Sequence, residues 1–355
     1  MSFGTEIHPE DVIYWMTNMG WMMGPWLVFS SSIIGASFLI YDGAHDFPDP
    51  YRMWDLLEKY KVKTAGVSPT LIRVLMSTDL EKIKSKDLSK LKFFASTSEP
   101  WNYDPWMWLF ENIGDSKRPI INYSGGTEIS GGILMGNPLR PLKPASFSDS
   151  CPGIAADVFD ENGNSVVDEV GELVIKVPWI GMTRSFLNDD EKYLNAYWSR
   201  LEDIWVHGDW ALKDKDGSWY ILGRSDETIK VAGKRVGPAE IESSLVNHPY
   251  VEEAAVIGVP HELKGNVIVC FCKLNEENYR EGLEVELKDK VAHELGKPLK
   301  PVDIFFVSDI PKTRNGKIMR RIIKKAFMKE NVGDITGLQN PDTLNEIANI
   351  ENRHK

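Results

Sequence analysis

The chain has 355 residues, of which 42% are hydrophobic and 26% are charged, and its formal net charge is −11. These values are typical of a globular protein, and the length allows two or three domains. The acidic balance argues against nonspecific nucleic-acid binding, and the lack of an apolar run of about 18 residues argues against a membrane span. Three cysteines and no signal-peptide pattern in residues 1–15 predict the reducing cytoplasm.

Residues 1–140 predict an α/β region. The short apolar runs at 36–43 and 91–97 end in turn residues, as buried parallel strands do. Helical spacing marks 51–62 and 68–83, and the second of these begins with a favourable Ser-Pro pair. Seven of the twelve tryptophans lie in the first 110 residues, and we expect them to pack a large core or line a groove.

Residues 141–224 predict a β-rich subdomain, which completes a larger part spanning 1–224. Residues 156–167 predict a hairpin with an Asn-Gly turn. The alternation continues at 171–178 and 217–224, with a second turn at Asp216-Gly217.

Residues 225–330 predict a separate α+β domain, followed by a polar tail at 331–355 that is expected to fray. Helices are predicted at 238–249 and 283–296, and strands at 252–260, 266–274 and 303–311. Cys270 and Cys272 are expected on one face of their strand, without the partners that a four-ligand zinc site needs.

A cluster of basic residues at 311–321 leads into a helix predicted at 316–329. An apolar stripe on that helix would consist of Ile318, Ile322, Ile323 and Phe327. Its solvated face would consist of Arg320, Arg321, Lys324 and Lys325. The helix does not explain Lys317, which follows a glycine in the preceding loop. An ammonium there would stabilise phosphate oxygens as charge develops on them.

Three further segments are candidates for chemistry. Residues 122–132 place four glycines after an apolar strand, so that free N–H groups and the Thr127 hydroxyl would bind phosphate and Glu128 would hold Mg²⁺; a plain turn is the alternative. Residues 207–224 contain Asp209, suited to a ribose diol, and Arg224 as its complement; an ordinary surface acid and base are the alternative. In 223–242, Gly233 suits a bend and Arg235 suits a phosphate.

Taken in this order, these segments resemble the AMP-forming acyl-CoA synthetases, the adenylate-forming family, and within it the acetyl-CoA synthetases most. GRSDETIKVAGKRVGPAEIE, LVNHPYVEEAAVIGVPHELKG and PKTRNGKIMRR carry the resemblance, which extends from residue 20 to about 328. It implies a partial α/β large domain with a β-rich subdomain and a mobile carboxyl-terminal α+β domain. It also implies ligation of a carboxylic acid to CoA through an acyl-adenylate, with ATP and Mg²⁺.

The resemblance implies a role for each matched residue. The adenine-flanking turn is matched by Ser98, Glu99 and Pro100. The nucleotide segment is matched by Asn122, Tyr123, Ser124, Gly125, Gly126 and Thr127. The ribose and phosphate contacts are matched by Asp209, Arg224 and Arg235, and the catalytic group by Lys317, Thr127 and Glu128. The CoA tunnel is matched by Ala232 and Gly233, the hinge by Asp226, and the acyl pocket by Met22, Met23, Thr97 and Gly125. A cation site is matched by Val246, His248 and Val251; a capping role for His248 is the alternative. Acetylation of Lys317 would remove its charge and switch off adenylation.

The sequence departs from the family pattern in three places. The Ser/Thr/Gly-rich phosphate loop has no match, so we expect the chain to correspond to the carboxyl-terminal part of a synthetase, with exposed sheet edges and apolar faces. The pocket tryptophan of acetyl-CoA synthetases is replaced at Ser124-Gly125, which opens volume for an acid longer than acetate. Ala292 stands where an arginine often meets CoA, and Lys290 or His293 would have to substitute.

These observations predict an AMP-forming ligase of a short-chain acid, acting with a separate amino-terminal half. A medium-chain acyl-CoA synthetase is the alternative enzyme. An inactive fragment or a nucleotide-binding module is the alternative without catalysis.

Overall fold

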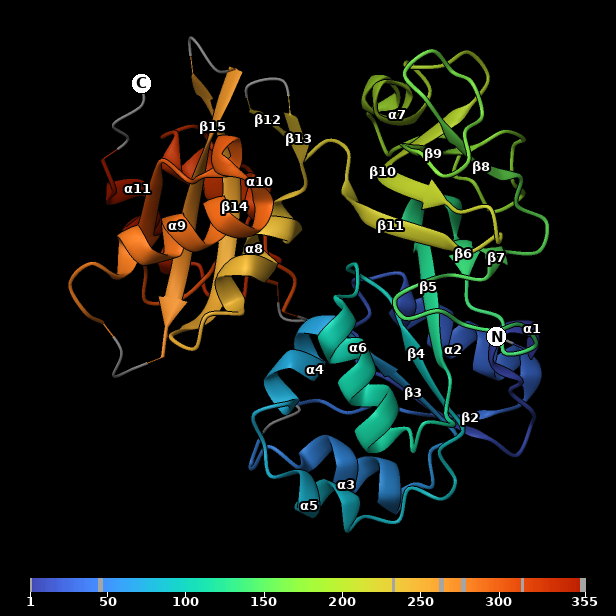
Figure 1. Cartoon of the computed structure of the whole chain (residues 1–355). Helices are drawn as coiled ribbons and strands as arrows, with labels where there is room; N and C mark the ends of the chain where they lie inside the picture. Colours follow the sequence, from blue (N-terminus) through green and yellow to red (C-terminus); the bar gives the residue numbers. More distant parts are fainter. Residues whose placement is uncertain are drawn as a thin grey trace. The chain divides into compact units, whose positions relative to one another are not determined.

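The computed structural model describes residues 2–43, 47–231, 234–261, 265–275, 279–313 and 316–351. It divides into two compact units, 1–222 and 223–355, each of which is described by itself below (Figure 1).

A seven-stranded sheet with the order β2-β1-β3-β4-β5-β6-β7 organises the first unit. The first five strands in that order are parallel, and β6 and β7 are antiparallel additions. The strands are β1 (Val12–Trp15), β2 (Ser37–Leu39), β3 (Thr64–Val67), β4 (Phe93–Ser96), β5 (Ile120–Gly126), β6 (Gly131–Met135) and β7 (Asp149–Ser150). The strand predicted at 91–97 is confirmed as the buried β4. The strand predicted at 36–43 is confirmed as β2, but it lies at the sheet edge and is not buried.

Helices precede and connect the parallel strands. They are α1 (Ser2–Thr5), α2 (Met23–Ile34), α3 (Arg52–Lys59), α4 (Pro69–Leu75), α5 (Leu80–Lys84), α6 (Tyr103–Trp108) and the π-helical turn η1 (Leu109–Ile113). Ser68 caps α4 by accepting a hydrogen bond from the Leu71 N–H (3.2 Å), as its sequence predicts. The helix predicted at 68–83 is interrupted, because Asp79 begins α5 as a second N-cap.

The tryptophans of this region mostly pack in the core, as expected. Trp54 is fully buried, and Trp101 and Trp106 are nearly so. Trp21 is the exception among them, with 40% of its surface exposed.

The β-rich region forms a four-stranded sheet with the order β11-β10-β9-β8. Its strands are β8 (Ala156–Phe159), β9 (Val170–Ile175), β10 (Trp205–Lys213) and β11 (Trp219–Arg224). The hairpin predicted at 156–167 is reduced to a single bridge between Phe159 and Ser165. Helix α7 (Asp190–Tyr197), which we did not predict, stacks Tyr197 on Trp205 with ring centroids 4.0 Å apart.

The second unit is a sheet covered by helices on both faces. Its strands are β12 (Ile229–Val231), β13 (Lys234–Val236), β14 (Val251–His261), β15 (Gly265–Leu274) and β16 (Asp303–Phe306). Its helices are α8 (Pro238–Val246), α9 (Leu283–Leu295), the short η3 (Lys297–Leu299), α10 (Arg320–Phe327) and α11 (Thr343–Asn349). Helices α8 and α9 contribute to one apolar cluster and α10 and α11 to another. Cys270 and Cys272 both belong to the first cluster, which confirms that they share a strand face.

Two expectations about this unit are wrong. The segment after residue 331 does not simply fray, because Leu338, Leu344 and Ile347 are buried in the cluster that α10 and α11 share. Arg320 is not on a solvated face: its side chain is 20% exposed, and its guanidinium pairs with Glu242 and Glu227. The apolar stripe of α10 is confirmed for Ile322, Ile323 and Phe327, which are buried.

Candidate active site

The carboxyl ends of strands β3, β4 and β5 lie at one edge of the seven-stranded sheet. Val67 at the end of β3 pairs with Ser96 at the end of β4, and Ser96 pairs with Asn122 in β5. The turn at 98–100 therefore follows β4 beside the segment 122–127. Ligands of open α/β sheets bind at this edge. The structure thus brings two of the predicted groups of residues together.

Glu99 fixes the turn that follows β4. Its carboxylate accepts hydrogen bonds from the backbone N–H of Thr70 (2.8 Å) and from the Arg73 guanidinium (3.0 Å). Thr70 lies in the first turn of α4, where the N–H groups favour a negative charge. The neighbouring Ser98 has a φ of 92°, a conformation that costs on the order of 1–3 kcal/mol and persists only where surrounding contacts hold it. Pro100 closes the turn.

Asn122 ties β5 to the segment that precedes β7. Its buried amide donates hydrogen bonds to the carbonyl oxygens of Ala145 (3.0 Å) and Ser146 (3.3 Å). The next residue, Tyr123, packs against Trp26, and burial raises the pKa of its phenol well above the usual range. Both side chains thus have structural partners at the strand end.

The expectation of an open glycine loop at 122–127 is wrong. Strand β5 runs to Gly126 and pairs with β6, so that Gly125 lies opposite Gly132. A Cβ added at Gly125 would lie 2.1 Å from the carbonyl oxygen of Gly131, so only glycine allows the two strands to approach this closely. The turn itself begins at Thr127, in the 3-10 turn η2 (Thr127–Ile129). The exposed Thr127 hydroxyl and the half-buried Glu128 therefore lie at a hairpin tip.

A bulge in β10 brings His207 and Asp209 to this hairpin. Val206 pairs with Val174 and Trp210 with Glu172, so the three residues between them face a single residue of β9, and Gly208 takes a φ of 84°. A Cβ added at Gly126 would lie 3.0 Å from Cε1 of His207 and 3.5 Å from Oε2 of Glu128. The side chains of His207 and Glu128 thus both border Gly126.

His207 is a site residue that the sequence analysis missed. Its Nδ1 accepts a hydrogen bond from the Trp205 indole N–H (3.3 Å), which places the proton of a neutral imidazole on Nε2. That Nε2 lies 3.7 Å from Oδ2 of Asp209, and both residues are buried. The signal in the sequence is the His-Gly-Asp triplet in an otherwise apolar strand.

The predicted acyl-pocket residues lie on three elements of the first unit, and only Met22 and Met23 pack beside the end of β1. Met23 is buried in a cluster with Trp15, Leu27 and Ala95, and Met22 packs against that cluster. Thr97, which directly follows β4, is half-buried. Gly125 has no room for a side chain on its present backbone, so the wall formed here is backbone.

In the second unit, Arg224 and Asp226 form a bidentate pair. The Arg224 Nε and Nη2 donate to the two carboxylate oxygens of Asp226 over 2.9 and 3.0 Å, and the Arg224 carbonyl accepts from the Thr228 hydroxyl. The predicted ribose contact and the predicted hinge residue are therefore direct partners. Ala232 and Gly233 lie outside the described residues. Arg235 lies in β13, paired with Lys230 of β12.

The backbone around Lys317 is anchored to Thr313. The Thr313 N–H donates to the Lys317 carbonyl (2.9 Å), and the Lys317 N–H donates to the Thr313 hydroxyl (3.2 Å). Thr313 is buried, whereas Lys317 is exposed, and Gly316 before it has a φ of 78°. A buried threonine thus holds the backbone of an exposed lysine three residues before α10.

The predicted cation site contains a histidine whose two ring nitrogens both have hydrogen-bond partners within the chain. His248 is buried, and its Nε2 lies 3.2 Å from Oε1 of Glu286, while its Nδ1 accepts from the Tyr250 N–H (3.3 Å). The hydrogen bond from His248, together with Arg280, lowers the pKa of the Glu286 carboxyl below its ordinary range. The His248 N–H donates to the Leu245 carbonyl (3.0 Å) at the end of α8, which is a helix-end bond of the kind expected as the alternative. Across the part of the chain that the structure describes, no three His, Cys, Asp or Glu side chains gather as a metal would need.

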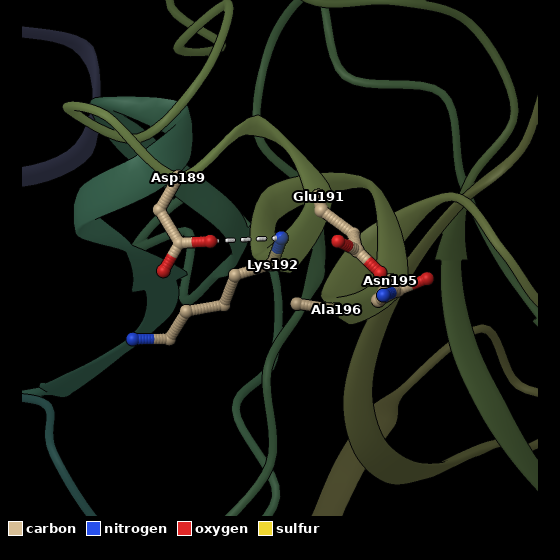
Figure 2. A pocket seen from close by; sticks show the side chains of 5 residues that line it. All are labelled: Asp189, Glu191, Lys192, Asn195 and Ala196. Carbon is tan, nitrogen blue, oxygen red and sulfur yellow. Dashed lines mark hydrogen bonds between the residues drawn. The ribbon is translucent and has the colours of Figure 1, made fainter.

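A shallow depression lies at the start of α7 in the first unit. Asp189, Glu191, Lys192, Asn195 and Ala196 line it, and the Asp189 carboxylate accepts a hydrogen bond from the Lys192 N–H (Figure 2). Its lining contains none of the predicted site residues. Among the residues described, no helix is long and apolar enough to cross a bilayer.

Comparison with known proteins identifies the sequence pattern. Residues 1–186 match the model of the AMP-binding enzymes, and residues 240–317 match that of the AMP-binding enzyme C-terminal domain. The acetyl-coenzyme A synthetase of Methanothrix thermoacetophila is 41% identical over 98% of this chain and 54% of its own length. That of Pyrobaculum aerophilum is 39% identical over 98% of this chain and 52% of its own length.

Solved structures give a similar result. An acetoacetyl-CoA synthetase from Streptomyces lividans has a TM-score of 0.86 and 26% identity over 98% of this chain and 54% of its own. An anthranilate CoA ligase in complex with anthranoyl-AMP has a TM-score of 0.74 and 25% identity over 90% of this chain and 60% of its own. The chain spans about half the length of the curated relatives it matches.

Proposed function

Because the chain belongs to the AMP-binding enzyme family, we propose that it supplies the nucleotide-binding strand ends and the carboxyl-terminal domain of an AMP-forming acid–CoA ligase of the acetyl-CoA synthetase type. One observation supports this proposal most. The turn at 98–100, the hairpin tip at Thr127-Glu128 and the bulge carrying Asp209 all belong to one unit, and the first two follow adjacent parallel strands.

The proposed reaction has two steps. A carboxylate oxygen attacks the α-phosphate of ATP, pyrophosphate leaves, and an acyl-adenylate forms. The CoA thiolate then attacks the acyl carbon, AMP leaves, and the thioester forms. Each step redistributes negative charge over phosphate oxygens, so fixed donors and cations at the right places accelerate it.

Each proposed role uses chemistry that the residue offers. Asp209 would accept hydrogen bonds from the ribose hydroxyls, and Thr127 would donate to phosphate oxygens. Mg²⁺, when bound, would neutralise phosphate charge, and the Glu128 carboxylate at the hairpin tip is a hard oxygen ligand suited to it. Lys317 would stabilise the developing charge during adenylation, and the buried Thr313 would hold its backbone for that task. Ala232 and Gly233 remain the predicted CoA contacts, and Asp226 the predicted hinge.

The proposed acid is a short-chain carboxylate. Met22 and Met23, which pack with Trp15 at the end of β1, would form one wall of the acyl pocket, and backbone would form the wall at Gly125. The replacement of the family's pocket tryptophan at Ser124-Gly125 favours a second candidate, a medium-chain acid, although Gly125 itself has no room for a side chain on its present backbone. A hydrophobic pocket discriminates between two acids that differ by one methylene by only about 1–3 kcal/mol. The two candidates therefore differ in how strongly the pocket prefers one chain length. The three cysteines are free and buried, which supports the proposed reducing compartment.

Acid-dependent exchange of labelled pyrophosphate into ATP tests the proposal. The chain is assayed with acetate, propionate, butyrate and octanoate, alone and together with the amino-terminal part of the Methanothrix thermoacetophila synthetase. We expect exchange with the short acids that falls at least about 100-fold in Lys317→Ala and is retained in the control Lys325→Ala. No exchange with any acid under either condition would contradict the proposal, and exchange only with octanoate would favour the medium-chain candidate.

A further inference from the structure

Helix α2 carries no charged side chain, yet one side of it faces solvent and exposes large apolar residues. Its sequence, MGPWLVFSSSII, contains no charged residue. Met23 and Leu27 are buried against the sheet, whereas Phe29 is 68% exposed and Ile33 is 85% exposed. Phe29 and Ile33 are four residues apart, so they form one ridge on the helix. A ridge of exposed large apolar side chains on an uncharged helix ordinarily marks a surface that another part of a protein covers.

Strand β2 lies next to this helix and is the edge strand of the seven-stranded sheet. It pairs in parallel with β1, and the described residues provide no partner for its other edge. The Ser37 N–H donates to the Asp11 carbonyl (2.9 Å), so the alternation of a strand turns the backbone N–H of Phe38 to the open side. Ile40, just after the strand, is 61% exposed. An open edge beside exposed apolar side chains is a template for another strand.

The relatives indicate what covers this surface. The C-terminal domain model matches residues 240–317, near the end of the chain, so the part of the relatives that the chain does not span lies mostly on the amino-terminal side. That part amounts to close to half of each relative. It would be joined to, or associate with, the first elements of this chain, and α2 and β2 are among them.

We propose that the ridge of Phe29 and Ile33, together with the open edge of β2, is the docking surface for the amino-terminal part of an acetyl-CoA synthetase-type large domain. The partner would add a strand to β2 and lay apolar side chains on α2. This inference rests on the proposed function, because it takes the partner from the same family. Leu187 and Ile180, each 92% exposed, lie outside α2 and β2 and provide matched controls.

Sedimentation velocity with the purified chain and the amino-terminal part of the Methanothrix thermoacetophila synthetase tests the surface directly. We expect a 1:1 complex. The double variant Phe29→Asp/Ile33→Asp should raise its dissociation constant at least tenfold, and Leu187→Asp/Ile180→Asp should leave it unchanged. Phe38→Pro, which removes the outward N–H while leaving the β1 ladder in place, should also weaken the complex. Unchanged melting temperatures of the isolated variants show that each one is folded.

Three results would overturn the inference: no complex, equal binding by the α2 variant and the wild type, or self-association of the chain that the α2 variant abolishes. The last result would assign the surface to a second copy. Pyrophosphate exchange measured on the same samples separates this inference from the function. A stable complex without exchange would refute the function alone, and exchange without any complex would refute the surface alone.

Discussion

The Arg320 guanidinium donates to both carboxylate oxygens of Glu242, over 2.7 and 2.6 Å. Glu242 is buried in α8 and also accepts from the Val256 N–H (2.9 Å). Arg320 begins α10, three residues after Lys317, and its third contact is with Glu227, the residue after Asp226. One side chain therefore connects α8, the segment around Asp226 and the start of the helix that follows Lys317.

Removing either partner of this pair should destabilise the second unit. Arg320→Gln leaves a buried carboxylate without its cation, at a cost of about 3 kcal/mol in the free energy of unfolding. The comparison is Lys215→Gln, which breaks the surface pair with Asp168 and should cost less than about 1 kcal/mol. Urea unfolding followed by circular dichroism measures both. Equal effects of the two variants would contradict the account of Arg320.

Gly125 should tolerate no side chain. In Gly125→Ala the Cβ meets the Gly131 carbonyl, so the β5–β6 hairpin must open, at a cost of about 1–3 kcal/mol. Gly337→Ala is the matched control, because a Cβ there meets nothing within 4 Å. The melting temperatures of both variants provide the measurement. A Gly125→Ala variant that melts at the same temperature as the wild type would show that the two strands of the hairpin are less closely packed than described.

Asn122 should act through stability rather than through nucleotide contact. Asn122→Leu leaves the carbonyls of Ala145 and Ser146 without their shared donor, and should lower the free energy of unfolding by about 2 kcal/mol. An unfolding titration gives this value, and calorimetry with AMP gives the affinity of the folded variant. A large loss of AMP affinity at unchanged stability would instead support the direct contact that the family pattern implies.

The carboxyl of Glu286 should titrate below its ordinary pKa of 4.5, because His248 and then Arg280 stabilise its charged form. A depressed folded-state pKa contributes stability above the unfolded pKa, and this contribution is lost as the pH falls through the folded value. Carboxyl ¹³C NMR between pH 2 and 6 should show the depressed pKa in the wild type and a rise toward 4.5 in His248→Gln. An identical titration in the two proteins would exclude His248 as the cause.

Local patterns predicted much of the fold. Ser68 marks the start of α4, Gly296 takes a φ of 104° at the end of α9, and apolar runs gave β4, β14 and β15. Features that depend on distant partners could not be predicted. Arg320 looks like a solvated helix residue until Glu242, 78 positions away, is beside it. Helix α11 is too short and polar to predict by pattern, and is positioned by the burial of Leu344 and Ile347.

In the candidate site, too, local sequence patterns predicted some features, and features that depend on distant partners could not be predicted. The segments at 98–100 and 122–127 were chosen from the sequence, but the extension of β5 through Gly125 depends on its pairing with β6. His207 was missed because only the bulge in β10 turns it toward Gly126. The two groups that donate hydrogen bonds to the Glu99 carboxylate likewise come from α4, so they depend on tertiary contacts.

The central claim is that the strand-end residues of the first unit form an adenylate site, and calorimetric titration of the chain with a non-hydrolysable acyl-adenylate analogue tests it most directly. The variant Asp209→Asn keeps the shape of the side chain and removes its charge, and Glu191→Gln changes a carboxylate in the depression at α7. The account predicts saturable 1:1 binding that Asp209→Asn weakens at least tenfold and Glu191→Gln leaves unchanged. Binding that is insensitive to Asp209, or lost only in Glu191→Gln, would contradict it.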